Sequence, residues 1–138
     1  MRGRGDMRRN LEETRAFFEK DRFAIHSGIT IDEVAEGYAR CSMEIRDHHR
    51  NANDVVMGGA VFTLADLCFG AASDGKAVSM TSEISFLHPA KGKRLCAEAR
   101  MIKDGRSSVF YEVRVSDDEG RIVAFVTMTG FRIAPDIN

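Results

Sequence analysis

The residues best suited to chemistry are one carboxylate and a pair of glycines in an otherwise apolar segment. Asp66 is the only charged residue between Gly58 and Ala72. An unpaired carboxylate in a dry interior is costly, so its position needs a reason. Gly58 and Gly59 let another group approach the backbone closely, and the first N–H groups of a helix favour negative charge. An acyl carbon could be attacked near the Asp66 carboxylate while the N–H groups at a helix start hold the oxygen of the acyl carbonyl.

The spacing of these residues predicts a site shared between two chains. At about 1.5 Å rise per residue, Asp66 lies roughly 10 Å along a helix from Gly59, and on the same face. One carbonyl cannot touch both groups, because each must come within about 3 Å of the reacting atoms. A two-fold axis between antiparallel helices would set Asp66 of one chain beside Gly59 of the other. We therefore expect a homodimer with two equal sites.

A simpler interpretation of the same helix stays open. The segment from Gly59 to Ala72 carries apolar or small residues around the whole helical wheel, which predicts a helix enclosed by other structure. However, Thr63, Asp66, Gly70 and Ser73 follow helical spacing and can form a narrow polar stripe. In that case Asp66 would only face water.

The elements that must position this helix are predicted by the periodicity of the rest of the chain. Asn10 can cap a helix over residues 11–22, with Glu12 and Glu13 in its first turn. Alternation of apolar and polar residues predicts strands at 29–34, 35–46, 78–86, 95–101, 109–115 and 122–133, with tight turns at 103–106 and 117–120. This order predicts an α+β fold in which a curved antiparallel sheet wraps around the central helix.

Length and composition exclude several classes of protein. A chain of 138 residues with 43% hydrophobic content fits one domain. We expect this domain to cover residues 10–138 and the basic segment 1–9 to be disordered. With 20 Lys and Arg against 21 Asp and Glu, the net charge is close to zero and gives no general attraction to nucleic acid or to an anionic membrane.

Features that would indicate export, a membrane or a metal do not occur in the sequence. The longest apolar run is too short to span a bilayer, and no signal-peptide pattern follows Met1. Cys41, Cys68 and Cys96 are an odd number without metal-ligand spacing. We expect a cytoplasmic protein with reduced cysteines in or near the core, no bound metal and no cofactor.

A known family shares these residues. Asn51, the pair Gly58 and Gly59, and the L-A-D tripeptide at 64–66 form a pattern that resembles the signature N-x-x-G-x-x-H-G-G followed by a hydrophobic helix with L-A-D. That signature belongs to hotdog-fold thioesterases of the 4-hydroxybenzoyl-CoA thioesterase superfamily, specifically the phenylacetate-degradation type. The resemblance continues through the strand end at 85–90 and the hairpin at 105–106.

The resemblance implies a fold, an assembly and a reaction. It implies a hotdog fold, a dimer with a continuous sheet that pairs again into a tetramer, and hydrolysis of acyl-CoA to free acid and CoA. Asp66 would act as general base or nucleophile, and the N–H of Gly58 or Gly59 would polarise the thioester carbonyl. Asn51 would hold the thioester region, and Ser79 would orient the water or the acid. The alternatives are an asparagine in a turn and an exposed strand serine.

A CoA substrate carries phosphates, which a nearly neutral chain must hold with local cations. The candidates are Arg106 and Lys103 in the hairpin and Lys91 after Pro89; the alternative is that these side chains are only solvated. The acyl group would lie along apolar side chains of the central helix, which are otherwise ordinary core residues: Phe62, Leu67 and Phe69.

Two departures from the family pattern keep other functions open. Met57 replaces the family histidine, and Asp54 replaces a glycine. A thioether donates no hydrogen bond, so His48 or His49 would have to supply one. Without it, the chain could be a non-catalytic hotdog protein that binds acyl-CoA or lipid. A hotdog hydratase or dehydratase is least favoured, because it needs a catalytic histidine and we expect none in or next to the central helix.

Overall fold

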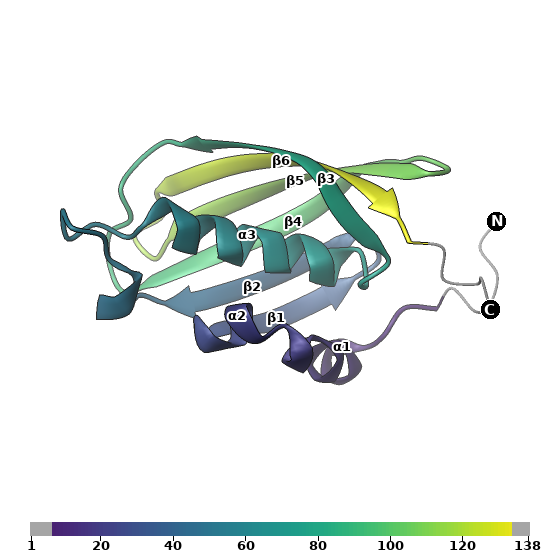
Figure 1. The fold of residues 1–138 in the computed structure, drawn as a ribbon, viewed down its shortest axis with the longest axis horizontal. Helices are drawn as coiled ribbons and strands as arrows, with labels where there is room; N and C mark the ends of the chain where they lie inside the picture. Colours follow the sequence, from purple (N-terminus) through teal and green to yellow (C-terminus); the bar gives the residue numbers. More distant parts are fainter. Residues whose placement is uncertain (1–6, 134–138) are drawn as a thin grey trace.

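One curved antiparallel sheet and one central helix make up most of the structure. The computed structural model describes residues 7–133. The strands are β1 (Ile29–Ala35), β2 (Tyr38–Glu44), β3 (Ala77–Phe86), β4 (Arg94–Asp104), β5 (Ser108–Asp117) and β6 (Ile122–Arg132). They are ordered β1-β2-β4-β5-β6-β3, and every neighbouring pair is antiparallel. Helix α3 (Gly58–Ala72) crosses the concave face of this sheet (Figure 1). The predicted α+β hotdog fold is confirmed.

The inner face of the sheet is built from alternating residues that are small where α3 crosses it. Ala39, Ala97 and Ala99 on β2 and β4 are fully buried. Because alanine projects only a methyl group, α3 approaches closely enough for the Cys68 thiol to donate to the carbonyl oxygens of Ala39 and Ala97, at 3.3 and 3.4 Å. All three cysteines are free thiols. The period-two pattern predicted these strands correctly.

The first predicted strand boundary is wrong. The sequence pattern placed one strand at 35–46, but Ala35 pairs with Tyr38 across a two-residue turn. Gly37 in that turn has a φ of 65°, a left-handed conformation that glycine adopts without strain. The alternation continues through the turn, so periodicity alone does not reveal it.

The N-terminal helix is shorter than predicted. Instead of one helix over 11–22, the chain forms α1 (Leu11–Phe17), a 3-10 turn η2 (Phe18–Lys20) and α2 (Arg22–His26). The predicted cap is confirmed: the Asn10 side chain accepts from the Glu13 N–H at 2.8 Å, and the Glu13 side chain accepts from the Asn10 N–H. The α-helix ends just before Phe18, which packs against Gly70 of α3. Tertiary contact therefore overrides helix propensity at this position.

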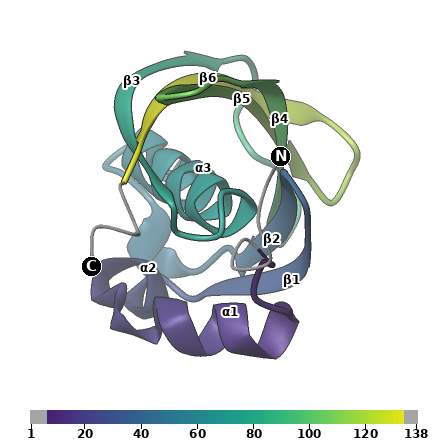
Figure 2. The ribbon, with the colours of Figure 1, turned by 90° about the vertical axis from the view of Figure 1, so that its right-hand side faces the viewer.

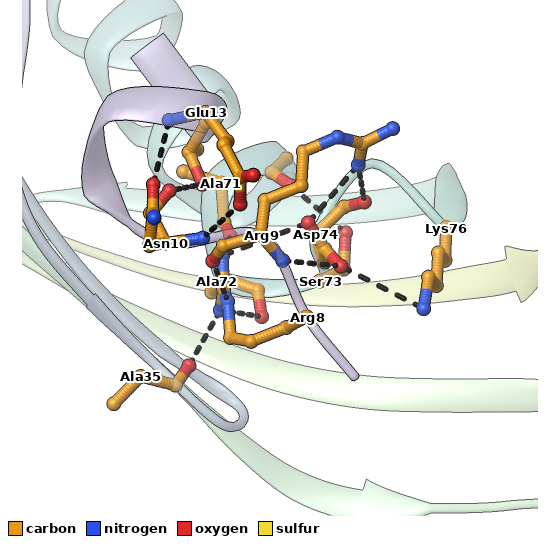
Figure 3. A network of polar contacts seen from close by, with 12 residues as sticks. Arg8, Arg9, Asn10, Glu13, Ala35, Ala71, Ala72, Ser73, Asp74 and Lys76 are labelled. Carbon is orange, nitrogen blue, oxygen red and sulfur yellow. Dashed lines mark hydrogen bonds and ion pairs between the residues drawn. The ribbon is translucent and has the colours of Figure 1, made fainter. Parts of the chain in front are cut away.

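Two arginines tie the N-terminal segment to the far end of α3 (Figure 3). Arg8 donates to the Ala71 carbonyl oxygen at 2.8 Å, and Arg9 pairs with the buried Asp74 carboxylate at 3.0 Å. Cations are favourable at a helix C-terminus, where carbonyl oxygens have no partner. Residues 1–6 of the segment expected to be disordered lie outside the described residues, whereas Arg8 and Arg9 have these defined contacts.

Helix α3 has an open side, so the prediction that it is enclosed all round is wrong for a single chain. The sheet curves over α3, with α1 and α2 below it in Figure 2. Most α3 side chains are buried, but Gly59 and Asp66 are exposed, and Ala60, Phe62 and Thr63 are half-buried. The open side carries small residues as well as Asp66. Because small residues occur on both sides, the hydropathy pattern did not distinguish the open side from the buried ones.

The edge strand β3 exposes apolar side chains that the sequence pattern placed on a buried face. Val78, Met80 and Phe86 are 52%, 65% and 56% exposed. The strand pairs only with β6 among the described residues, and a bulge interrupts that pairing between Ser79 and Thr81. An exposed apolar edge is a place where another strand can add to the sheet. Within residues 7–133, no helix is long and apolar enough to cross a membrane.

Candidate active site

The start of α3 presents backbone N–H groups that none of residues 7–133 uses. Ala60 and Val61 donate their N–H to the Met57 carbonyl oxygen, at 3.0 and 3.2 Å. Among the described residues, no acceptor lies on the N–H of Gly58 or Gly59. Gly58 packs against the Phe86 ring, where an added Cβ would lie 2.9 Å from it, whereas an added Cβ on Gly59 would meet only Met57 side-chain atoms at 4.0 Å. Gly59 therefore offers a free donor at the positive end of the helix dipole.

Asp66 lies on the same open side of α3. The hydroxyls of the proposed polar stripe bond back to the helix, Thr63 to the Gly59 carbonyl oxygen at 2.7 Å and Ser73 to that of Gly70 at 3.1 Å. By contrast, the Asp66 carboxylate has no hydrogen bond or ion pair with any described residue. Asp66 thus differs from the rest of the stripe in being unpaired.

The surroundings of Asp66 make it a stronger base than an ordinary aspartate. Although the residue is exposed in the single chain, the protein atoms around it desolvate the carboxylate, and this burial raises its pKa above the ordinary 3.8. The negative charge of Asp21, at the start of α2, raises the pKa of Asp66 further. A carboxylate of this kind takes up a proton more readily, as general-base catalysis requires.

A groove of about 890 Å³ opens beside the first turns of α3. It lies between α2, the 3-10 turn η3 (Asp47–His49) and the helix start. Its lining includes the free amide position and three histidines; the residues are Arg22, Phe23, His26, Ser27, His48, His49, Met57, Gly59, Ala60 and Thr63. The prediction that no histidine lies next to the central helix is therefore wrong. The sequence did not reveal that histidines lie beside the helix, because they belong to two other elements, α2 and η3.

Comparisons with known proteins identify the family of this chain. A family model described as the thioesterase superfamily matches residues 53–124. The chain belongs to the thioesterase superfamily. A putative esterase of Archaeoglobus fulgidus is 34% identical over 108 residues, which cover 75% of this chain and 70% of the relative. The acyl-coenzyme A thioesterase PaaI of Escherichia coli is 28% identical over 130 residues, covering 91% and 93%.

Solved structures in the same superfamily have the same fold. The E. coli PaaI structure superimposes with a TM-score of 0.81 at 30% identity, covering 86% of this chain and 89% of that one. A Streptococcus mutans protein, smu.793, solved with acetyl CoA bound, gives a TM-score of 0.72 at 28% identity, covering 77% and 89%. The resemblance to the phenylacetate-degradation type of hotdog thioesterase is thus confirmed, and with it the prediction of a thioester hydrolase.

The predicted thioesterase residues do not all meet within one chain. Asn51 is exposed, and its side-chain oxygen accepts from the N–H of Asn53 at 2.9 Å and of Val55 at 3.2 Å. These contacts fit the alternative of an asparagine in a turn. Ser79 is exposed near the beginning of β3, whereas Gly58 contacts Phe86 at the end of that strand. Ser79 and the helix start therefore lie at opposite ends of β3.

The three cations expected to hold CoA are likewise split between two ends of the sheet. Lys103 and Arg106 lie at the β4–β5 hairpin, whose Ser107 carbonyl oxygen accepts from the N–H of Arg132. Lys91 lies beyond the other end of β4, where its N–H donates to Asp117 at 2.9 Å. Since β4 spans 11 residues, its ends are roughly 30 Å apart. All three cations are exposed, but one chain cannot bring them to the same CoA.

The side chains expected along the acyl group belong to the core. Leu67 and Phe69 are buried, and Phe69 packs edge-on against Tyr111 with ring centroids 5.1 Å apart. Phe62 is half-buried against the same core. The alternative of ordinary core residues is therefore the observed one for Leu67 and Phe69. The groove beside Gly59 is an apolar space that reaches the helix start.

His49 is a structural residue and not the missing donor. Its Nδ1 accepts from the Arg46 N–H at 2.9 Å, so its Nε2 carries the proton and donates to the Ser27 carbonyl oxygen at 2.8 Å. Burial lowers the pKa of His49, which favours this neutral form. With both ring nitrogens occupied, His49 cannot bind a substrate. Across residues 7–133, no group of three or more His, Cys, Asp or Glu side chains is arranged to hold a metal ion.

Proposed function

We propose that this protein is an acyl-CoA thioesterase that hydrolyses a CoA thioester to free acid and CoA at a site shared between two chains. The observation that carries the proposal is that the open side of α3 presents both a carboxylate without a partner, Asp66, and a backbone N–H without an acceptor, that of Gly59. The name of the E. coli relative and the acetyl CoA bound to the S. mutans relative support CoA thioesters as the substrate class.

A homodimer joined through β3 would complete this site. Asp66 and Gly59 of one chain are separated by roughly 10 Å along the helix, too far for one carbonyl. Antiparallel pairing of two β3 strands about a two-fold axis would continue the sheet and place the open sides of both α3 helices side by side. The Asp66 carboxylate of one chain would then face the Gly59 N–H of the partner.

The same arrangement accounts for the separation of the other site residues. In an antiparallel β3 pair, the beginning of one strand lies beside the end of the other. Ser79 would therefore approach the partner's helix start. Lys103 and Arg106 would lie at the same end of the dimer as Lys91 of the other chain. Residues that one chain keeps apart would thus serve one CoA.

The groups present support two routes of thioester hydrolysis. As a base, Asp66 takes a proton from a water whose oxygen attacks the thioester carbonyl carbon, and the Gly59 N–H holds the resulting oxyanion. The C–S bond then breaks, and the CoA thiolate receives the proton. As a nucleophile, the carboxylate forms a mixed anhydride and releases CoA, and water hydrolyses the anhydride to restore Asp66.

The position of the acidic limb of the pH–rate profile should depend on Asp21. Asp66 must be ionised to act, so kcat/KM falls as pH drops through its raised pKa. Replacing Asp21 by Asn removes a negative neighbour, which lowers the pKa of Asp66. We expect the acidic limb of Asp21→Asn to move to lower pH, measured as kcat/KM from about pH 4 to 8. A shift to higher pH, or none, would mean that Asp66 does not set this limb.

A side chain at Gly59 should block the oxyanion position without harming the fold. A Cβ there meets only Met57 atoms at 4.0 Å, and alanine and valine are better helix formers than glycine. We expect Gly59→Ala to lower kcat/KM modestly and Gly59→Val to lower it by about 100-fold. Both should unfold at or above the wild-type temperature. Unchanged kcat/KM in Gly59→Val would remove the helix start from the site.

The proposed activity is tested by a panel of aryl and medium-chain acyl-CoA esters with free thiol as the readout. We expect the wild type to release CoA from at least one ester class and Asp66→Ala to release it only at background rate. Equal release by both proteins would show that Asp66 is not the acid involved.

Met57 favours a second candidate, a non-catalytic protein that binds acyl-CoA or lipid. Met57 is the N-cap residue of α3, and its thioether makes no side-chain cap and donates no hydrogen bond. Saturable binding of acyl-CoA without release of CoA by the wild type would favour this candidate over hydrolysis.

We further propose a dimer of dimers in the cytoplasm. The N-terminal helices expose Phe17, Phe23 and Ile25, which offer a second apolar surface besides β3. Three free thiols suit a reducing compartment. Light scattering at several protein concentrations would separate a dimer from a tetramer.

A further inference from the structure

The groove beside Gly59 contains one imidazole that neither the fold nor the proposed reaction uses. His48 lines this groove together with Met57 and Gly59. It is exposed, and neither of its ring nitrogens has a hydrogen-bond partner among residues 7–133.

His48 is held next to the helix start by its neighbours. The Met57 N–H donates to the His49 carbonyl oxygen at 2.8 Å, and Arg50 forms a β-bridge with Val56. Such pairing places the two segments about 5 Å apart. The His48 ring packs on the His49 ring with centroids 4.3 Å apart, and His49 is fixed by its two hydrogen bonds. His48 and Gly59 therefore line the same groove, and the contact between His49 and Met57 holds the turn that carries His48 beside the helix start.

The other polar groups of the groove are bonded elsewhere or belong to α2. Thr63 donates to the Gly59 carbonyl oxygen and Ser27 to that of Phe23. Arg22 and His26 belong to α2, whereas His48 belongs to η3, next to the residue whose carbonyl oxygen accepts from the N-cap of α3. His48 is thus the free side-chain donor beside the segment that contacts the helix start.

We propose that His48 is a catalytic residue that donates a hydrogen bond to the thioester carbonyl oxygen, as a second donor beside the Gly59 N–H. This inference rests on the proposed thioesterase function. The Met57 side chain at the N-cap cannot donate, so the oxyanion would otherwise have backbone donors alone. As negative charge develops on the oxygen, the hydrogen bond strengthens. The effect therefore falls on kcat more than on KM.

The test compares variants at two groove positions under saturating and limiting acyl-CoA. We expect His48→Ala to lower kcat by about 10- to 100-fold with KM changed less than about threefold. His48→Gln keeps a side-chain donor and should retain more kcat than His48→Ala. Adding Met57→His to His48→Ala should restore part of kcat, because the residue 57 side chain lies 4.0 Å from where a Cβ on Gly59 would be.

Several outcomes would overturn the inference. A wild-type kcat in His48→Ala, or equal losses in His48→Ala and His48→Gln, would each remove the donor role. Thermal unfolding of each variant separates loss of fold from loss of donor. If the wild type turns over and Asp66→Asn does not, while His48→Ala equals the wild type, only the His48 inference fails. If the wild type hydrolyses no ester, the proposed function fails with it.

Discussion

Replacing Asp66 by asparagine is expected to lower kcat by about 10²- to 10⁴-fold while the proposed dimer stays intact. Asparagine has the same shape but can neither accept a proton nor act as a nucleophile. The change touches no hydrogen bond or ion pair of the described residues, because Asp66 makes none there. The measurement is kcat for the best ester of the panel, with the molecular mass in solution as the control. Turnover within tenfold of the wild type would contradict the role of Asp66.

The same substitution should raise stability at neutral pH. The pKa of Asp66 is raised in the folded state, so the folded chain binds its proton more tightly than the unfolded chain does. The ionised form therefore destabilises the fold. This cost is absent below the unfolded pKa of 3.8 and grows as pH rises through the folded pKa. We expect Asp66→Asn to unfold at a higher temperature than the wild type at pH 7, with the difference vanishing near pH 3.5. A lower unfolding temperature at pH 7 would mean that Asp66 stabilises the fold.

Placing a lysine on the edge of β3 is expected to separate the dimer and abolish turnover. Met80 is an exposed apolar side chain on the strand that we propose pairs with its copy. Met80→Lys adds one ammonium group per chain. In the dimer, these two like charges would repel each other near the two-fold axis, and each would lose solvent, so both effects oppose strand pairing. Because Asp66 and Gly59 then lose their partner groups, kcat/KM should fall by at least about 100-fold. The measurements are molecular mass by light scattering and kcat/KM at the same protein concentration.

A matched control is available on the same sheet. Ile102 is also apolar, 56% exposed and on a strand, but β4 has neighbours on both sides. Ile102→Lys should therefore leave mass and kcat/KM unchanged. A monomeric Met80→Lys protein with full activity would show that one chain carries a complete site.

Local patterns predicted the parts of the fold whose surroundings lie within one chain. The alternation of Leu95, Ala97 and Ala99 gave the inner face of β4 because α3 of the same chain covers it. Asn10 with Glu13 gave a cap whose two bonds span three residues. In both cases, a spacing of two or three residues predicted which side chains face the core or form the cap.

The parts that the sequence did not reveal depend on distant contacts or on a second chain. The α1 helix ends before Phe18, which packs on the distant Gly70, and the ring of His49 is fixed by a bond to Ser27. The alternation in β3 predicted a buried face, yet Met80 is exposed in the single chain. The motif around Gly58, Gly59 and Asp66 indicated the reacting groups, but it carried no sign of the groove that η3 and α2 build beside them.

The most direct test of a shared site is a mixed dimer of two inactive variants. Asp66→Asn and Gly59→Val, each with a different affinity tag, are produced together, and the dimer that carries both tags is isolated. If each site takes Asp66 from one chain and Gly59 from the other, one of the two sites is intact in this dimer. We then expect about half of the wild-type kcat per dimer. If Asp66 and Gly59 act within the same chain, both sites carry one defect, and the mixed dimer will be as inactive as its parents.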